Sequence, residues 1–315
     1  MNYRSFSDLS RILREAQAKI PTDIDLVVGI PRSGMLVANL IALNSNVNAC
    51  DIDSFIANRS LSHGQTRKIR NSNLKYPHDA QHVLVVDDSI DTGASLDNAR
   101  ASIARSQVKQ KTTFAACFAT DAAKSKVDLF FEILPKPRIF EWNLMHRSFL
   151  AECCLDIDGV LCMDPTAAQN DDGTEYLRFL KTALPLALPT YPIAHLVTSR
   201  LEKYRAQTEA WLEKFGITYK ALHMLDLPDA ATRRKLRCHA AFKAEIYAKL
   251  HETKLFIESD PAQAQEIVRL TGKHVLCYST QQFLKPAMSY AHLRHTSGHI
   301  IHKISAKLYG KFRIS

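Results

Sequence analysis

Short apolar runs alternate with longer amphipathic segments along most of the chain. The apolar runs that we interpret as buried strands are residues 25–30, 82–87, 112–119, 153–158, 194–199, 254–259 and 274–279. Residues 34–44 and 95–107 lie between such runs, and their apolar positions recur at helical spacing. The repeated order of strand and helix predicts an α/β fold with parallel sheets whose faces are covered by helices.

A connector near the middle of the chain divides this pattern into two series. Residues 134–154 read "LPKPRIFEWNLMHRSFLAECC", with two prolines and several aromatic residues after the third predicted strand. A chain of 315 residues is long enough for two hydrophobic cores. We therefore predict a first domain at 1–150, a second at 151–285 and a C-terminal tail at 286–315.

Composition narrows the class of protein. The seven cysteines lack metal-ligand spacing, and the N-terminus is polar and unlike a secretory signal, which predicts a reduced, cytoplasmic protein without a membrane span. The net charge of +9 is concentrated in the tail, because no acidic residue follows Glu266. In the tail, apolar residues recur at helical spacing beside Lys303, Lys307 and Lys311. This pattern predicts peripheral contact with anionic lipid at the inner face of the membrane.

The stretch "HVLVVDDSIDTGAS", residues 82–95, places polar residues directly after an apolar strand. At the carboxyl end of a parallel strand, a following helix offers unpaired N–H groups to an anion. Gly93 allows close backbone approach, and the hydroxyls of Thr92 and Ser95 suit phosphate oxygens. Because carboxylates repel phosphate, Asp87 and Asp88 are expected to face sugar hydroxyls or a metal instead.

This pattern resembles the phosphoribosyl pyrophosphate (PRPP) site of type I phosphoribosyltransferases. The segment "VVGIPRSGMLVA" at 27–38 is similar to the pyrophosphate loop of that family, with Arg32, Ser33 and Gly34 at its tip. The basic run 58–76 matches the mobile loop of the family. Residues 138–146 resemble its hood, where Phe140 or Trp142 would stack on an acceptor or belong to the core.

The resemblance implies roles for these residues. Asp87 and Asp88 would hold the ribose hydroxyls, and residues 91–95 would hold the 5-phosphate, namely Asp91, Thr92, Gly93, Ala94 and Ser95. Asp91 matches the position of the general base in purine-using members of the family. Departure of pyrophosphate from C1 leaves a cation-like sugar and a highly charged leaving group, so Mg²⁺ and protein cations are expected near the pyrophosphate.

A second set of motifs follows in the second domain. "CLDIDGVLC" at 154–162 resembles the first motif of the haloacid dehalogenase (HAD) superfamily, and the other motifs of that superfamily follow in order. Thr198 comes after a strand, Lys243 near the start of a helix, and Glu258 with Asp260 after another strand. Short separations between the motifs leave no room for a large cap domain, so an open site for a bulky substrate is expected.

The HAD resemblance implies a phosphatase. Asp156 would be the nucleophile, Asp158 would protonate the leaving alcohol, and Thr198 and Lys243 would hold the phosphoryl group. Ser199 remains an alternative to Thr198, and Lys235 or Lys254 to Lys243. Mg²⁺ would be held by four carboxylates, those of Asp156, Asp158, Glu258 and Asp260.

Together the two sites resemble the two-domain ribofuranosyltransferases of bacterial polysaccharide assembly, such as O-antigen synthesis. Such an enzyme would transfer phosphoribose from PRPP, with inversion, to a glycan or lipid-linked glycan and then remove the 5-phosphate. One alternative is nucleobase phosphoribosyl transfer coupled to nucleotide dephosphorylation. Another is a PRPP-sensing regulator that binds RNA, although the sequence has no aromatic-interleaved RNA motif and nucleic acid is an unlikely partner.

Overall fold

The protein is described by a computed structural model that covers residues 1–62, 68–70, 73–106 and 108–286. The chain divides into two compact units, Met1–Trp142 and Asn143–Ser315. The division falls within the 3₁₀ helix Glu141–His146, slightly before the expected boundary near residue 150. The tail interpreted above as a lipid-binding helix, residues 287–315, lies outside the described residues, as do residues 63–67 and 71–72 of the basic run.

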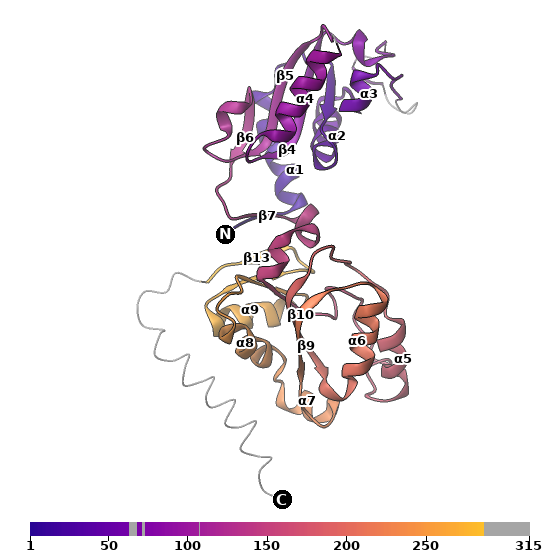
Figure 1. The fold of residues 1–315 in the computed structure, drawn as a ribbon, viewed down its shortest axis with the longest axis vertical. Coiled ribbons are helices and arrows are strands. Elements are labelled where there is room, and N and C mark those ends of the chain that lie inside the picture. The colour runs from indigo at the N-terminus through magenta and orange to yellow at the C-terminus, as the bar shows by residue number, and fades with distance from the viewer. Residues whose placement is uncertain (63–67, 71–72, 107, 287–315) are drawn as a thin grey trace, which may run out of the picture. The chain divides into compact units, whose positions relative to one another are not determined.

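The first unit is built on a five-stranded parallel sheet with the order β3-β2-β4-β5-β6 (Figure 1). Its strands are β2 (Leu26–Gly29), β3 (Asn48–Asp51), β4 (His82–Ile90), β5 (Lys111–Ala119) and β6 (Leu129–Ile133). Its helices are α1 (Phe6–Glu15), α2 (Ser33–Ser45), α3 (Ile52–Ile56) and α4 (Ala94–Arg105). A separate parallel pair joins β1 (Asn2–Arg4) to β7 (Arg138–Phe140).

Helices cover both faces of this sheet because the central positions of β2, β4 and β5 are apolar and buried. Val27, Leu84 and Val86 pack with α1 and α2, whereas Val83 and Val85 pack with α3 and α4. Alternate residues of a strand point to opposite faces, so a continuous apolar run supplies both cores. The parallel α/β fold expected from the sequence is confirmed.

The second unit contains a six-stranded sheet with the order β10-β9-β8-β11-β12-β13, in which only β13 is antiparallel to its neighbour. The strands are β8 (Cys153–Leu155), β9 (Ile193–Leu201), β10 (Tyr219–Leu225), β11 (Leu255–Glu258), β12 (His274–Cys277) and β13 (Gln282–Leu284). The helices are α5 (Thr174–Thr182), α6 (Arg205–Lys214), α7 (Ala230–Leu236), α8 (His239–Lys249) and α9 (Pro261–Thr271). Helices α8 and α9 pack together on one face, and α5 and α6 lie on the other (Figure 1).

Each sheet has one point at which the chain reverses its direction of travel across the sheet. In the first unit, β2 leads outward to β3 while its neighbour β4 leads to β5 on the other side. In the second unit, β8 leads to β9 while its neighbour β11 leads to β12. Ligands of open α/β sheets bind at such switch points, beyond the carboxyl ends of the strands. The four predicted motifs that follow β2, β4, β8 and β11 therefore lie at the two positions where this fold binds ligands.

The two units have separate hydrophobic cores, so each is expected to fold by itself. Fragments 1–142 and 143–315, expressed separately, should each unfold in one cooperative thermal transition, measured by circular dichroism. Fragment 1–141 serves as a comparison, because it lacks the Trp142 ring that stacks on Phe140. It should melt below fragment 1–142 by a few degrees, the shift expected for about 1 kcal/mol in a domain of this size. Fragments that remain unfolded would show that the division is not one of folding units.

Candidate active sites

Strand β4 carries the two acidic residues of the first site. The strand was expected to end at residue 87, but it continues to Ile90, so Asp87 and Asp88 lie inside it. Asp87 is only 8% exposed and Asp88 only 5%. The backbone N–H of Asp88 donates to Asp87 Oδ1 at 2.8 Å, and the indole N–H of Trp142 donates to Asp88 Oδ2 at 2.8 Å. Both carboxylates are thus oriented by hydrogen bonds before any ligand binds.

No lysine or arginine in the described part of the chain forms an ion pair with either carboxylate. Burial, reinforced by the negative charge of Asp88, raises the pKa of Asp87 to about 7. An arriving cation or a set of hydroxyl donors would relieve this repulsion. The pair is therefore suited to a magnesium-bound or hydroxyl-rich ligand.

The loop between β2 and α2 lies directly beside this pair. A side chain at Gly34 would place its Cβ 2.7 Å from Val86 O and 3.1 Å from the Cα of Asp87, so only glycine fits without a shift of the backbone. Arg32, at the tip of the loop, is exposed, and Ser33 begins α2. The structure thus brings Gly34 close to Asp87, and Ser33 and Arg32 directly precede Gly34 in the chain.

The loop after β4 forms the N-terminus of α4. Gly93 has φ +83°, and a side chain there would meet Lys126, whose Nζ donates to Thr92 O at 2.5 Å. Thr92, Ala94 and Ser95 are exposed beside the first turn of the helix. Free N–H groups of that turn and these hydroxyls can bind an anion.

Asp91 and the aromatic residues complete the description of the first site. The exposed Asp91 pairs with Lys136 Nζ at 2.6 Å. Phe140 is 1% exposed and belongs to the core, which is the second of the two roles that the sequence left open for it. Trp142 stacks on Phe140 with ring centroids 4.8 Å apart and lies 5.7 Å from the Phe6 ring. Much of the hood's aromatic surface is therefore used inside the protein.

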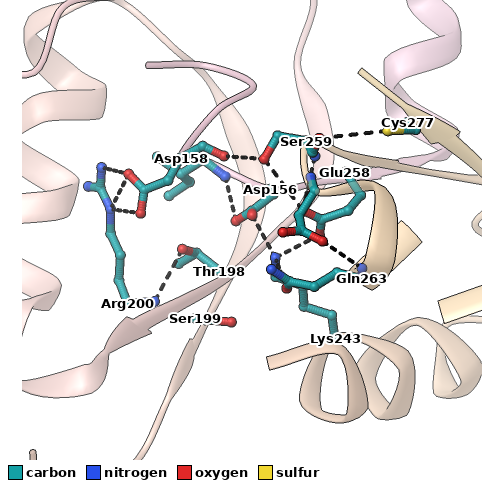
Figure 2. A network of polar contacts seen from close by, with 12 residues as sticks. Asp156, Asp158, Thr198, Ser199, Arg200, Lys243, Glu258, Ser259, Gln263 and Cys277 are labelled. Atoms are coloured by element: carbon teal, nitrogen blue, oxygen red, sulfur yellow. Dashed lines mark hydrogen bonds and ion pairs between the residues drawn. The ribbon is translucent and has the colours of Figure 1, made fainter. Parts of the chain in front are cut away.

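The buried ammonium of Lys243 organises the second site. From α8 it donates to Asp156 Oδ2 and to Glu258 Oε2, each at 2.6 Å, and to Gln263 Oε1 at 3.0 Å (Figure 2). These residues come from the loop after β8, the end of β11 and the start of α9. The other lysines considered from the sequence lie elsewhere: Lys235 is exposed, and Lys254 pairs with Glu152.

The charges of this group depend on each other. Burial lowers the pKa of Lys243, but the carboxylates of Asp156 and Glu258 outweigh burial and leave it raised. Burial raises the pKa of Asp156, and the ammonium of Lys243 counters part of that rise. The backbone N–H groups of Ser259 and Asp260 donate to Glu258 Oε1 at 2.9 and 3.1 Å. Glu258 is therefore fully hydrogen-bonded, whereas Asp156 lines an open cavity.

Asp158 is held by an arginine that the sequence interpretation did not single out. Arg200, 1% exposed, donates from Nη2 to Asp158 Oδ1 at 2.6 Å and from Nε to both carboxylate oxygens at 3.1 and 3.2 Å (Figure 2). Its only signal in the sequence was a charged residue inside the apolar run of β9, two positions after Thr198. Such a residue needs a buried counter-charge, and Asp158 supplies it.

A cavity of about 650 Å³ lies over these residues. Both Thr198 and Ser199 line it, so the choice between them stays open. Thr198 Oγ1 accepts a hydrogen bond from the backbone N–H of Arg200 at 3.3 Å. The hydroxyl proton of Thr198 is therefore available to a ligand. Between β8 and β9 the chain forms one α-helix, α5.

The four predicted metal ligands differ in the protein contacts that their carboxylates already make. Glu258 and Asp158 are paired with Lys243 and Arg200, and Asp260 Oδ1 caps α9 by accepting the Gln263 N–H at 2.8 Å. Within the described ranges, no three carboxylate, thiol or imidazole side chains converge closely enough to hold a metal. Nevertheless, burial and the charges of Asp158 and Asp156 raise the pKa of Asp164, which indicates an excess of negative charge at this wall. Oxygen donors suit Mg²⁺, so the chemistry of the donors fits the ion, while the four-carboxylate set is not assembled.

Residues 2–146 match the family model described as "Phosphoribosyl transferase domain". The first unit is a phosphoribosyltransferase domain. The match covers less than half of the chain and does not reach the second unit's β8. Comparison with curated proteins gave no match.

Several solved structures similar to this chain are described as phosphoribosyltransferases. The xanthine-guanine-hypoxanthine enzyme of Helicobacter pylori aligns with 21% identity and a TM-score of 0.33, over 45% of this chain and 92% of that enzyme. A purine enzyme of Pyrococcus horikoshii aligns with 17% identity and a TM-score of 0.32, over the same shares. The adenine enzyme of Saccharomyces cerevisiae aligns with 22% identity and a TM-score of 0.26, over 41% of this chain and 78% of that enzyme.

In the described part of the chain no helix has the length and apolar character needed to cross a bilayer.

The raised pKa of Asp87 predicts a pH-dependent gain of stability on neutralising this residue of the phosphoribosyltransferase domain. Because its folded pKa, about 7, exceeds the unfolded value near 3.8, wild-type stability falls as pH rises through that window. Asp87→Asn removes this loss, so the variant should be more stable than wild type at pH 8, by roughly 2–4 kcal/mol, and similar to it near pH 4. Denaturant unfolding at several pH values measures the difference. Parallel stability curves for the two proteins would contradict the assignment.

Replacing Lys243 should destabilise the protein, and this loss of stability should grow as pH rises. Lys243→Met leaves Asp156 and Glu258 buried without a cation, so a loss of about 3–5 kcal/mol is expected at pH 8. The loss should shrink toward pH 5, because the unpaired carboxyls then bind protons in the folded state. Lys254→Met, which removes the surface pair with Glu152, is the control and should cost less than about 1 kcal/mol. Equal losses for the two variants would refute the central role of Lys243.

Proposed function

We propose that the protein is a bifunctional ribofuranosyltransferase: the phosphoribosyltransferase domain transfers phosphoribose from PRPP, and the second unit removes the 5-phosphate. The observation that carries this proposal is the Lys243 ammonium between Asp156 and Glu258, beside Thr198 in one cavity. A phosphoribosyltransferase acting alone has no use for such a site. The serial order follows because the product of the first reaction carries the phosphate ester that the second would hydrolyse.

In the transfer step, the bond between C1 of ribose and pyrophosphate breaks, and a bond forms between C1 and an acceptor oxygen with inversion. Asp87 and Asp88 would hold the ribose hydroxyls, while the loop 91–95 would hold the 5-phosphate. Arg32 is exposed at the pyrophosphate loop, where its charge would stabilise the leaving group. Bound Mg²⁺ would neutralise pyrophosphate charge as it departs. Asp91, a candidate base for the acceptor proton, would have to leave its ion pair with Lys136.

For the second step we propose the chemistry of the HAD superfamily. Asp156 attacks phosphorus, the bond to the 5-oxygen breaks, and water then releases inorganic phosphate from the aspartyl phosphate. Lys243 and Thr198 would hold phosphoryl oxygens, and Mg²⁺, bound with Asp156 as its principal ligand, would offset charge repulsion. Asp158 would protonate the leaving alcohol, which requires its tight pairing with Arg200 to change during the reaction.

A glycan or lipid-linked glycan is the acceptor that we favour over a nucleobase. A base is held by stacking on an aromatic face, yet Phe140 is in the core and Trp142 stacks on it. The cavity of the second unit has two exposed apolar residues in its lining, Met163 and Leu186, and no enclosing cap domain, which suits a large substrate. The similarity to purine enzymes keeps nucleobase transfer as the second candidate.

The variant Asp156→Asn separates these candidates. It keeps the shape of the side chain but removes the nucleophile, so dephosphorylation should slow by about 10⁴-fold or more. With PRPP and a panel of glycan acceptors, mass spectrometry should show a product heavier than that of wild type by one phosphate. Added phosphatase should convert this product into the wild-type product.

The matched control is the double variant Asp87→Asn, Asp88→Asn. It should stop release of pyrophosphate from PRPP and leave hydrolysis of an aryl phosphate intact. With nucleobases offered in place of glycans, formation of a nucleotide would instead support nucleobase transfer. Identical unphosphorylated glycan from wild type and Asp156→Asn would overturn the serial mechanism.

A further inference from the structure

Arg233, on the short helix α7, is a buried cation without a carboxylate partner. Only 8% of the residue is exposed, and it lines the same cavity as Asp156 and Lys243. The other buried cations of this unit, within the residues that the structure describes, are paired: Arg200 with Asp158, and Lys243 with Asp156 and Glu258. Arg233 forms no such pair, so its charge is uncompensated in the absence of a ligand.

The groups that hold the Arg233 side chain are neutral. Nη1 donates to Ser199 O at 2.8 Å, Nη2 donates to Asn170 Oδ1 at 3.2 Å, and the phenol of Tyr176 is a further hydrogen-bond neighbour. The Nε–H is buried and has no hydrogen-bond partner. A guanidinium carries five N–H donors, so these three contacts leave two donors, one of them the Nε–H, for a ligand. Burial of a charge on neutral partners is unfavourable unless an anion completes the site.

A second unpartnered group lies beside this arginine. The hydroxyl of Ser199 is buried without a hydrogen-bond partner, and Ser199 also lines the cavity. The 2.8 Å bond from Arg233 to the carbonyl of Ser199 fixes the two residues next to each other. His239, at the start of α8, lines the cavity too, and burial together with the charges of Arg233 and Lys243 lowers its pKa. This part of the wall therefore combines unused donors with positive potential.

We infer that Arg233, with the hydroxyl of Ser199, forms an anion subsite of this cavity that binds a phosphate group of the substrate. The planar fork of arginine matches two phosphate oxygens, and fixed neutral contacts hold the fork in place before binding. The identity of the substrate rests on the proposed phosphatase function, but binding of an anion does not. The group bound is either the phosphoryl group that is cleaved or a second phosphate on the leaving group.

The test compares Arg233→Gln with Arg234→Gln, an exposed neighbour on the same helix, in the full chain with Mg²⁺. Arg233→Gln should raise the inhibition constant of inorganic phosphate against aryl phosphate hydrolysis by about 10- to 100-fold, the range for lost hydrogen bonds to a charged group. KM should rise by a similar factor with little change in kcat, and Arg234→Gln should change neither. Ser199→Ala should weaken phosphate binding by several-fold.

Two further substrates identify which phosphate is bound. If the inhibition constant of phosphate is unchanged while KM rises for ribose 1,5-bisphosphate and not for ribose 5-phosphate, the subsite holds a second phosphate. If neither quantity changes in a folded Arg233→Gln protein, or if Arg234→Gln has the same effect, the subsite does not exist. Arg233→Lys, which keeps the charge and loses the fork, should be intermediate and serves if the glutamine variant does not fold.

A binding measurement separates this inference from the phosphatase proposal. Inorganic phosphate should raise the melting temperature of wild type and Arg234→Gln but not of Arg233→Gln. If wild type hydrolyses no phosphate ester and still shows this Arg233-dependent stabilisation, the phosphatase proposal fails and the anion subsite stands. If wild type hydrolyses esters and Arg233→Gln is stabilised as strongly as wild type both by phosphate and by ribose 1,5-bisphosphate, the subsite fails and the phosphatase stands.

Discussion

Burial of carboxylates at the ends of parallel strands is the constraint on which both sites depend. Such groups are expensive to ionise inside a protein unless a cation or several donors compensate them. In the second unit the ammonium of Lys243 compensates Asp156 and Glu258 within the protein itself. In the first, Asp87 accepts a backbone N–H and Asp88 the indole N–H of Trp142, and neither forms an ion pair with a described residue. The first site therefore depends on its ligand for compensation, whereas the second is largely neutralised in advance.

This difference matches the chemistry proposed for the two sites. Two uncompensated carboxylates attract the hydroxyls and magnesium that a sugar diphosphate would bring, and they need carry out no bond-making themselves. A nucleophilic carboxylate must instead remain ionised and oriented when a negatively charged phosphate ester arrives. An ammonium 2.6 Å away, fixed by a second carboxylate and by Gln263, meets that requirement.

The sequence predicted the seven central strands and both switch-point loops because continuous apolar runs signal buried parallel strands. It did not predict strands such as β3 and β10, since most of their residues are only partly buried and form no apolar run. It named Lys243, but could not exclude Lys235 or Lys254, because only packing decides which lysine faces the cavity. Arg200 and Arg233 were missed for the same reason: their partners, Asp158 and Ser199, are more than thirty positions away along the chain.

The lining of the second cavity carries side chains of both charges. Asp156, Asp164 and Asp260 supply negative charge to its lining, and Arg233 and Lys243 supply positive charge. A phosphate ester binds where donors converge, and a divalent cation binds where carboxylate oxygens gather. Asp156 belongs to both groups, since it lines the cavity among the acids and accepts the ammonium of Lys243. A nucleophile in that position would share one cavity with the cationic side chains that suit a phosphate ester and the carboxylates that suit a cation.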